Sequence, residues 1–411
     1  MPLPHATSDL EGIGGTLGPR PDDVEIEEVP RNKFAQKGPY LYVLIEKKGI
    51  GTLEALRQLS EAAQVPPRDL SAAGFKGPAA VTRQWVAIRR LAENGIMYLE
   101  TPSLNVVSQT RHNARLHAGH MLKNRFKVRI RKPKPGALAK AEKIIARLVR
   151  QGVPNFFGVN RLGPRGDAPR IGRALLRNDL NTAIDLMLGR SDAPDPDPRQ
   201  REARSLYDQG KIAEAAALFP RSLRTEWRML EALARGSSKE QAARFLKTNE
   251  RRFFVAALQA QVFNKILARR IGEYHQVKVG DLVIDHATGA ATLRQGAESD
   301  AADAASFACS ATGLVPGTGV GLAAGEPGII EQDVLSEVGV SCADFDSLKP
   351  TCEGERRPLR FRLEAPTVEE EEDDLVLQFE IPPGAYATSF LRELLKVAID
   401  EIEEDGPDTM S

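Results

Sequence analysis

The sequence predicts a globular protein that mixes α-helices and β-strands (α/β or α+β), and three observations support this class. The 411 residues are 42% hydrophobic and 27% charged, which excludes wholesale disorder and leaves ample length for a core. Short segments alternate apolar and polar residues, as half-buried strands do. Longer segments repeat apolar residues at helical spacing. Both kinds of segment recur along the chain, so one or two mixed domains are expected.

The N-terminal third contains three predicted strands and one predicted helix. Residues 1–20 are rich in glycine and proline, and we expect them to be mobile. Val24 to Glu28 alternates apolar and charged residues, as an edge strand does, and Leu41 to Ile45 is apolar enough for a buried strand. Thr52 is a suitable N-cap for a helix that runs to Ala63. Val81 to Ile88 alternates again and predicts a further strand.

The middle of the chain is mainly helical by its periodicity. Phe126 to Ile130 predicts a strand with one basic face, and two prolines end it soon afterwards. Leu138 to Gln151 is an amphipathic helix, and residues 200–272 are mostly helical. Thr312 to Gly328 is rich in glycine but lacks the Gly-Lys-Ser/Thr ending of a phosphate-binding loop. We therefore interpret it as a long structural loop.

Charge is balanced overall but unevenly distributed along the chain. Lys plus Arg and Asp plus Glu each number 56, yet Thr101 to Ala141 contains ten basic residues and no acidic one. Acidic residues gather instead at Glu369 to Asp374 and at Asp400 to Asp408. A basic stretch in a neutral protein is typical of a face that binds a polyanion such as nucleic acid. A solvated strand and loop is the alternative interpretation.

Several classes of site and location are not expected. Cys309, Cys342 and Cys352 have no metal-type spacing, and their odd number argues against a disulfide framework. The spacing of His117 and His120 could suit a metal on a helix, but no third ligand is evident, so we expect surface or RNA-facing histidines. The chain begins without a signal-peptide pattern and has no run of 18 apolar residues. We expect a cytoplasmic protein without metal or membrane association.

Motifs spread over most of the chain resemble those of one family, the TruD family of tRNA pseudouridine synthases. The motifs follow the family's order, and GVPNFFGVNRLG (Gly152 to Gly163) is the most specific of them. The others are Pro21-Asp22-Asp23 with LYVLIEKKGIGTLEALRQL (Leu41 to Leu59), Asn124-Arg125-Phe126, Phe263-Asn264, and IPPGAYATSFLREL (Ile381 to Leu394). Between the first two lies AGFKGPAAVTRQW, Ala73 to Trp85, which resembles the family's active-site segment.

This resemblance implies an architecture. It is the pseudouridine synthase fold, built on a mixed, mostly antiparallel sheet, with a TruD-specific α/β domain inserted into it. We place the insertion at residues 160–350, which leaves residues 1–159 and 351–411 for a discontinuous catalytic-type domain. The strand Leu375 to Ile381 and the helix Thr388 to Asp400 would return to that domain. RNA is expected in the cleft between the two domains.

One departure from the family bears directly on chemistry. The family's Gly-x-Lys, here Gly74 to Lys76, is followed by an aspartate that is indispensable for converting uridine to pseudouridine, a reaction that uses no cofactor. This chain has Gly77 at that position, and a glycine presents no carboxylate. The family's lysine before the Pro-Asp-Asp is replaced by Gly18. Catalysis is therefore expected to be impaired or lost.

Residues suited to RNA binding remain. Basic side chains contact phosphates, and an aromatic ring can stack on a base. Phe126 has a second interpretation as a core residue of its strand, and Asn124 has one as a turn residue. The candidate RNA-binding residues are Lys76, Arg83, Asn124, Arg125, Phe126, Lys127, Arg129 and Arg161.

Three functions are consistent with these observations. The first is a TruD-like monomer that binds tRNA or another structured RNA, with a D-stem uridine as the family's target, but no longer isomerises it. The second is an active tRNA pseudouridine synthase that uses another carboxylate, such as Asp69 or Asp23. The third is a protein-interaction scaffold with a residual fold, against which the basic stretch argues.

Overall fold

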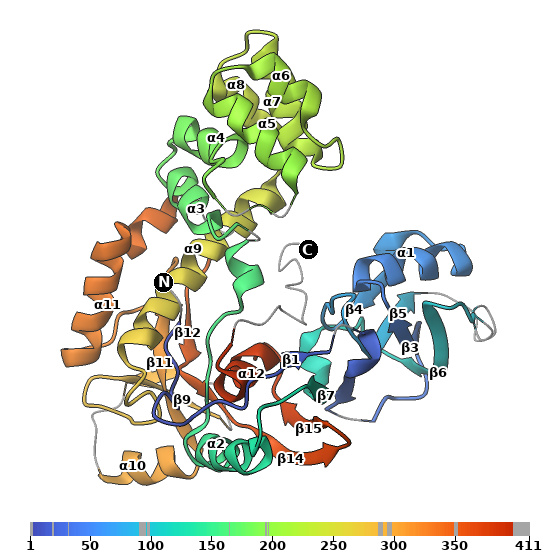
Figure 1. The fold of residues 1–411 in the computed structure, drawn as a ribbon, viewed down its shortest axis with the longest axis vertical. Coiled ribbons are helices and arrows are strands. Elements are labelled where there is room, and N and C mark those ends of the chain that lie inside the picture. The colour runs from blue at the N-terminus through green and yellow to red at the C-terminus, as the bar shows by residue number, and fades with distance from the viewer. Residues whose placement is uncertain are drawn as a thin grey trace. The chain divides into compact units, whose positions relative to one another are not determined.

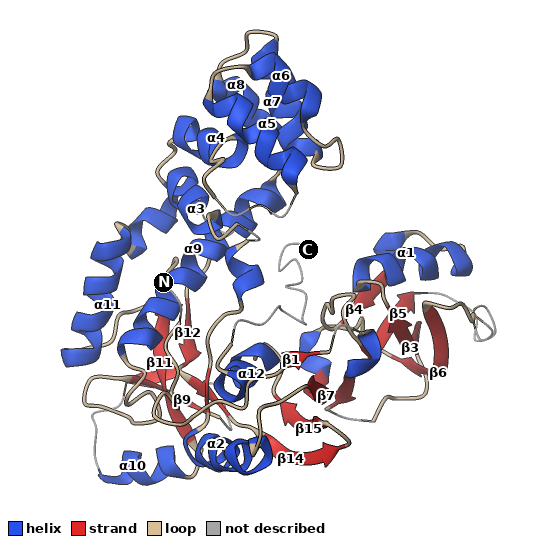
Figure 2. Ribbon diagram, in the orientation of Figure 1, coloured by secondary structure: helices blue, strands red, loops and turns tan. Residues whose placement is uncertain are grey.

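The computed structural model describes two compact units. Its described residues are 3–18, 20–31, 33–89, 96, 99–163, 165–193, 195, 197–286, 291–293, 298–348 and 352–397. Among them, the first unit comprises the chain up to Phe156, Ile271–His275 and the chain from Arg360 onward. The second unit comprises Phe157–Arg270 and Gln276–Leu359. Both units mix helices and strands, so the predicted class is confirmed (Figures 1 and 2).

The first unit is built on a sheet that has nine strands within the described residues. Seven strands form its main path, in the spatial order β14 (Glu364–Glu371), β15 (Asp374–Ile381), β7 (Met121–Arg131), β2 (Val24–Pro30), β5 (Val81–Arg89), β3 (Tyr40–Lys48) and β6 (Leu104–His112). The short strands β1 (Thr16–Leu17) and β4 (Leu70–Ala72) pair with β7 and β5. Only the β2–β5 pair is parallel among these described strands, so the mostly antiparallel sheet is confirmed.

The interpretation of Val24 to Glu28 as an edge strand was wrong. The strand β2 lies between β7 and β5, in the middle of the sheet. Alternation of apolar and charged residues reports only that one face of a strand is polar. In β2 that face is matched by basic residues of β7, with Glu25 opposite Lys127 in the register.

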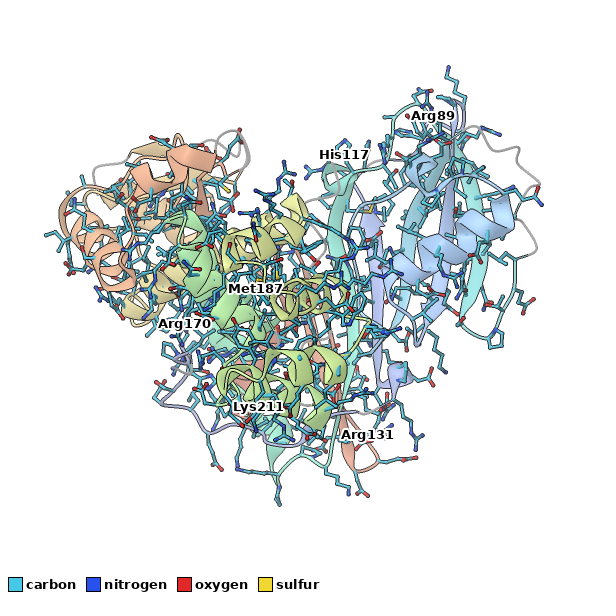
Figure 3. The ribbon with its side chains drawn as sticks, turned by 90° about the horizontal axis from the view of Figure 1, so that it is seen from above. Arg89, His117, Arg131, Arg170, Met187 and Lys211 are labelled. Atoms are coloured by element: carbon cyan, nitrogen blue, oxygen red, sulfur yellow. The ribbon has the colours of Figure 1, made fainter. Side chains whose placement is uncertain are left out.

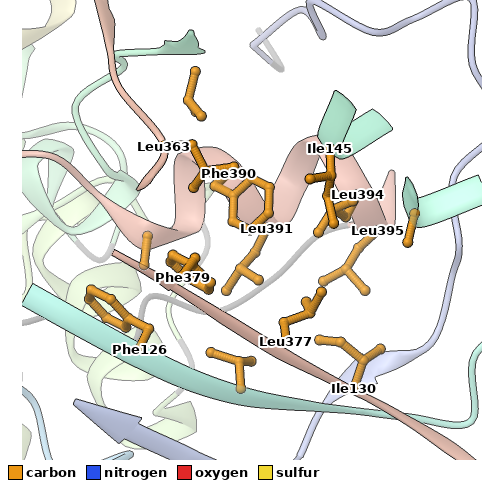
Figure 4. Close-up of a cluster of buried hydrophobic side chains, with 14 of the residues drawn as sticks. Phe126, Ile130, Ile145, Leu363, Leu377, Phe379, Phe390, Leu391, Leu394 and Leu395 are labelled. Atoms are coloured by element: carbon orange, nitrogen blue, oxygen red, sulfur yellow. The ribbon is translucent and has the colours of Figure 1, made fainter. Parts of the chain in front are cut away.

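Three of the described helices pack on apolar surfaces of this sheet. The helices α2 (Ala137–Gln151) and α12 (Ala387–Leu395) pack against β7 and β15, and Figure 4 shows the apolar side chains that they enclose. Phe126 and Phe379 stack there with ring centroids 5.1 Å apart. Over β3 and β5 lies α1 (Thr52–Ala63), whose Leu59 is fully buried. Burying each such side chain contributes about 1.5–3 kcal/mol.

The N-terminal segment is ordered, contrary to the expectation of mobility, within the described residues 3–18. The Thr7 N–H and hydroxyl both donate to the carboxylate of Glu393 on α12, at 3.0 and 2.7 Å. Farther along, the Ile13 N–H donates to the Leu394 carbonyl at 2.8 Å. Glu393 is fully buried and needs donors, and the N-terminal segment supplies them. Composition alone missed this pairing between opposite ends of the chain.

The second unit combines a helical region with a small antiparallel sheet. Its helices are α3 (Ala168–Leu176), α4 (Leu180–Leu188), α5 (Pro198–Asp208), α6 (Ile212–Leu218), α7 (Arg224–Ala234), α8 (Lys239–Ala242), α9 (Thr248–Arg269), α10 (Glu298–Ala305) and α11 (Gly325–Val338). Its strands, in spatial order, are β10 (Ala291–Leu293), β9 (Leu282–Asp285), β11 (Cys309–Val315) and β12 (Glu355–Pro358). The predicted helical character of residues 200–272 is confirmed.

Two local features of the second unit depart from simple sequence patterns. The helices α3 and α9 approach so closely that a Cβ atom on Gly172 would overlap the Phe254 carbonyl. The predicted loop from Thr312 to Gly328 is shorter than expected, because β11 extends to Val315 and α11 begins at Gly325. All seven residues of β11 are buried.

Candidate active site

The segment that resembles the family's active-site loop connects β4 to β5 in the first unit. Gly77 is buried in this loop, and its carbonyl accepts a hydrogen bond from the Lys47 ammonium at 2.8 Å. The same ammonium donates to the Ile50 carbonyl at 2.8 Å. Lys47 lies at the end of β3 and is fully buried, so its charge is directed to the loop. The loop therefore has a defined backbone at Gly77, the position where the resemblance leads us to expect an aspartate.

A second set of hydrogen bonds fixes the loop on the preceding side. The Lys76 N–H donates to the Thr52 hydroxyl oxygen at 2.8 Å, and the Thr52 N–H donates to the Lys76 carbonyl at 3.1 Å. The Thr52 hydroxyl donates to Oε1 of Gln84 at 2.9 Å. Thr52 was predicted to be the N-cap of α1, but Gly51 occupies that position because the Thr52 hydroxyl serves the loop.

The Lys76 side chain points to a buried carboxylate. Its ammonium lies 3.7 Å from Oε1 of Glu28 on β2, and both side chains are at most 9% exposed. The other Glu28 oxygen accepts the Trp85 N–H at 3.0 Å. Burial raises the pKa of Glu28, and the Lys76 ammonium opposes part of that rise. Lys76, proposed from sequence as an RNA contact, is thus turned toward the protein interior.

Sequence reasoning missed Lys47 and Glu28 as site residues, although a signal existed. Each charged residue continues the apolar face of its strand: Glu28 follows Val24 and Ile26, and Lys47 follows Val43 and Ile45. A charge at such a position is costly unless it is paired. Two such positions on neighbouring parts of one sheet therefore indicate a built polar site.

The acids named as possible replacements for the aspartate lie elsewhere. Asp23 pairs with Arg131, and its second oxygen accepts the Arg20 N–H at 3.3 Å. Asp69 ends a short 3-10 helix before β4. Glu28, by contrast, lies beside the loop, because its carboxylate is 3.7 Å from the Lys76 ammonium.

Position 18 has no room for a larger side chain. A Cβ atom on Gly18 would overlap the carboxylate and Cβ of Asp23. Asp23 itself is 4% exposed and held by its ion pair with Arg131. A larger residue at position 18 therefore requires Asp23 to move.

The basic face of β7 is neutralised by carboxylates from three other strands. Figure 3 labels Arg131, the last residue of this strand, and His117, which precedes its first residue by four positions. The pairs are Arg125 with Glu380 (2.9 Å) and Glu27 (3.2 Å), Lys127 with Glu25 (3.9 Å), and Arg129 with Asp374 (3.6 Å) and Glu371. Arg83 on β5 pairs with Glu46 at 2.7 Å. The part of the predicted basic stretch that lies on β7 therefore forms a ladder of ion pairs with neighbouring strands.

The remaining predicted residues lie in different environments. Phe126 is fully buried against Phe379, which agrees with its interpretation as a core residue and leaves no ring face for a base. Asn124 is 9% exposed and lies on β7, so it is not a turn residue. Arg161 lies in a 3-10 turn of the second unit and is half-buried. The structure thus does not bring the whole predicted set together.

Histidines of the basic stretch form a cluster without the arrangement of a metal site. The rings of His117 and His120 have centroids 4.0 Å apart, and those of His112 and His120 are 5.4 Å apart. Nδ1 of His117 accepts the Gly119 N–H, and Nδ1 of His120 accepts the His117 N–H. Within the described ranges, no three potential ligands are placed to hold a metal ion.

No described helix is long and apolar enough to cross a membrane.

Comparison with known proteins identifies the family to which this chain belongs. The sequence profile described as tRNA pseudouridine synthase D (TruD) matches residues 3–394. Curated proteins named tRNA pseudouridine synthase D are similar over almost their whole length. The protein from Geobacter sp. strain M21 is 37% identical over 95% of this chain and 99% of its own, and a protein from Thermus thermophilus is 33% identical over 98% and 95%.

A solved structure shows the same fold. The crystal structure of a Methanosarcina mazei protein described as a putative tRNA pseudouridine synthase D superimposes with a TM-score of 0.78 at 27% identity, over 96% of both chains. This match confirms the pseudouridine synthase fold that the motifs predicted. By profile, by sequence identity and by structure, the chain belongs to the TruD family of tRNA pseudouridine synthases.

Proposed function

We propose that this chain binds tRNA but is impaired in, or has lost, the isomerisation of uridine. One observation carries the proposal: the active-site loop is fully built, yet Gly77 offers no carboxylate at the family's catalytic position. Four buried side chains hold the loop or its lysine, namely Lys47, Thr52, Gln84 and Glu28. A framework retained around an absent catalytic group favours a binding role over catalysis.

The exposed ion pairs of the first unit support RNA binding at low cost. An exposed pair is worth only about 0–1 kcal/mol, so a phosphate can replace a carboxylate as the partner of Arg125 or Lys127. Both side chains are about half exposed, at 50% and 47%. Replacing Arg125, Lys127 and Arg129 together with alanine should weaken tRNA binding. It should also reduce the slope of log affinity against log salt by roughly 0.7–0.9 per lost phosphate contact.

The test of the catalytic proposal is a pseudouridine assay on an unmodified tRNA transcript. The purified protein should bind the transcript in a gel-shift titration and form no pseudouridine detectable by carbodiimide mapping. Pseudouridine that accumulates with enzyme concentration would overturn the proposal of impaired catalysis.

An active synthase remains the second candidate, and Glu28 is the observation that favours it. This carboxylate is buried, contacts Lys76 of the loop, and has a raised pKa, as a group that exchanges protons often does. If pseudouridine forms, Glu28→Gln should abolish it without weakening tRNA binding. Glu27→Gln is the matched control, because Glu27 is the adjacent residue on the opposite, exposed face and pairs with Arg125.

Restoring the aspartate tests whether the loop still has catalytic geometry. We expect at most weak activity from Gly77→Asp, because Pro78 follows it and a misplacement of about 1 Å costs on the order of a hundredfold in rate. Adding Gly18→Lys would place a lysine where the resemblance leads us to expect one, but the overlap with Asp23 makes this second change destabilising. Full activity from Gly77→Asp would show that the site differs from its relatives by one group.

We further propose that the two units correspond to the family's domains. The first unit carries the nine-stranded sheet of the described residues and the active-site loop, as the catalytic-type domain does. The second unit would then be the inserted TruD domain. Differential scanning calorimetry of the full chain tests this assignment, because two separately folded domains should unfold in two transitions, and a single two-state transition would contradict it.

A further inference from the structure

A hollow in the second unit has the chemistry of a nucleotide site. It has a volume of about 530 Å³ and lies beside α6 and α7, the short helices labelled together in Figure 1. Alanines of α6, followed by Phe219 and Pro220, line it on one side, and Trp227 of α7 contributes an indole. Three arginines line it, Arg199, Arg221 and Arg235, against one acidic residue, Glu231. Figure 3 labels Lys211, which directly precedes α6.

Each of the three arginines has a contact with a neighbouring group. The Arg221 guanidinium lies 5.4 Å from the centroid of the Trp227 ring. Arg199 uses its Nε to donate to the Leu218 carbonyl at 3.0 Å, which holds the side chain at the rim. Arg235 donates to Glu231 at 3.0 Å, an exposed i,i+4 pair that costs little to exchange. After this pair is counted, the rim keeps two positive charges.

We propose that this hollow binds one unpaired nucleotide of an RNA. The base would stack on Trp227 beside Arg221, and the phosphate would lie against Arg199 and Arg235. Stacking on an aromatic side chain and electrostatic contact with phosphate together are the means by which proteins hold single-stranded nucleic acid. The volume lies within the range of small-molecule sites. An acidic peptide would satisfy the arginines but would leave the flat indole without a ring to stack on.

This inference rests on the proposed function only in taking RNA as the partner. It adds a contact in the second unit, independent of the active-site loop and of the β7 ion pairs.

Fluorescence of Trp227 provides a direct test in the full chain. The protein has two tryptophans, so Trp85→Phe leaves Trp227 as the only one. Titration with a single-stranded hexaadenylate RNA should quench its emission in a saturable and salt-dependent manner. Replacing Trp227 with alanine should weaken hexanucleotide binding about tenfold, as should Arg221→Ala.

The matched control is Arg228→Ala, which removes an exposed arginine that lies next to Trp227 on α7 but outside the hollow. It should change binding less than twofold. Equal effects of Arg221→Ala and Arg228→Ala, or an RNA that leaves Trp227 emission unchanged, would overturn the inference. Quenching by polyglutamate and not by RNA would also overturn it and assign the site to acidic peptides.

A titration with intact tRNA separates this inference from the proposed function. Absence of any tRNA binding by the parent protein would refute the proposed function. Binding of tRNA equally to the parent and to Trp227→Ala, without quenching by the hexanucleotide, would refute the site alone.

Discussion

Replacing Lys47 with methionine removes the buried ammonium that holds the active-site loop. Lys47 is fully buried and donates to the carbonyls of Ile50 and Gly77, each at 2.8 Å. Methionine keeps the length and the apolar stem of the side chain, so the change isolates the charge and its hydrogen bonds. The loop carbonyls would then lose a donor that the buried site cannot replace.

The expected loss of stability follows from these contacts. A hydrogen bond from a charged donor contributes about 1.5–3 kcal/mol, and methionine recovers part of this because no ammonium must be desolvated. We expect Lys47→Met to lower the free energy of unfolding by about 2–4 kcal/mol. Lys48 is the internal control: it is 47% exposed, and its partner Asp22 is 61% exposed. Lys48→Met should cost less than about 1 kcal/mol.

Urea titration followed by circular dichroism measures both variants. Hydrogen exchange measured by mass spectrometry shows where the structure is loosened. The amides of residues 74–80 should exchange faster in Lys47→Met and at the parental rate in Lys48→Met. If the two variants unfold at the same urea concentration, or if exchange in the loop of Lys47→Met stays at the parental rate, then Lys47 does not hold the loop.

Three further predictions concern stability. Gly18→Ala should cost about 1–3 kcal/mol because it displaces Asp23, whereas Gly272→Ala, with open space at its Cβ, should be near neutral in thermal melts. The pKa of Glu393 is about 2 against an ordinary 4.5: burial alone would raise it, but hydrogen bonds from Thr7 and Ala6 and the positive charge of Lys396 prevail. About 3 kcal/mol of stability should therefore be present above pH 4.5 and vanish as the pH falls toward 2, and Glu393→Gln should flatten that acid limb. Burial and then the neighbouring His117 lower the pKa of His120 from 6.5, so stability should decline as the pH falls below 6.5, and less so in His120→Gln.

The local sequence pattern was sufficient to predict the most periodic helices and strands and to identify the family. The helix α1 ends at Ala63 as predicted and begins one residue earlier, α2 also begins one residue earlier than predicted, and β5 ends one residue later. These segments have strong periodicity of their own, and their caps and turns lie within a few residues of sequence. The absence of a carboxylate at Gly77 is likewise a property of the sequence alone.

The environment of each charge was decided by tertiary structure. The sequence alone shows ten basic residues without an acid from Thr101 to Ala141, but sheet pairing places Glu25 and Glu380 beside them. The N-terminal segment appeared mobile until Glu393, 386 residues after Thr7, supplied its acceptor. Sequence by itself therefore determined the most strongly periodic helices and strands, the family they build and the presence of a glycine at position 77. Only the folded structure decided which charges are paired, buried or exposed to solvent, because those partners meet through contacts between segments far apart in the chain.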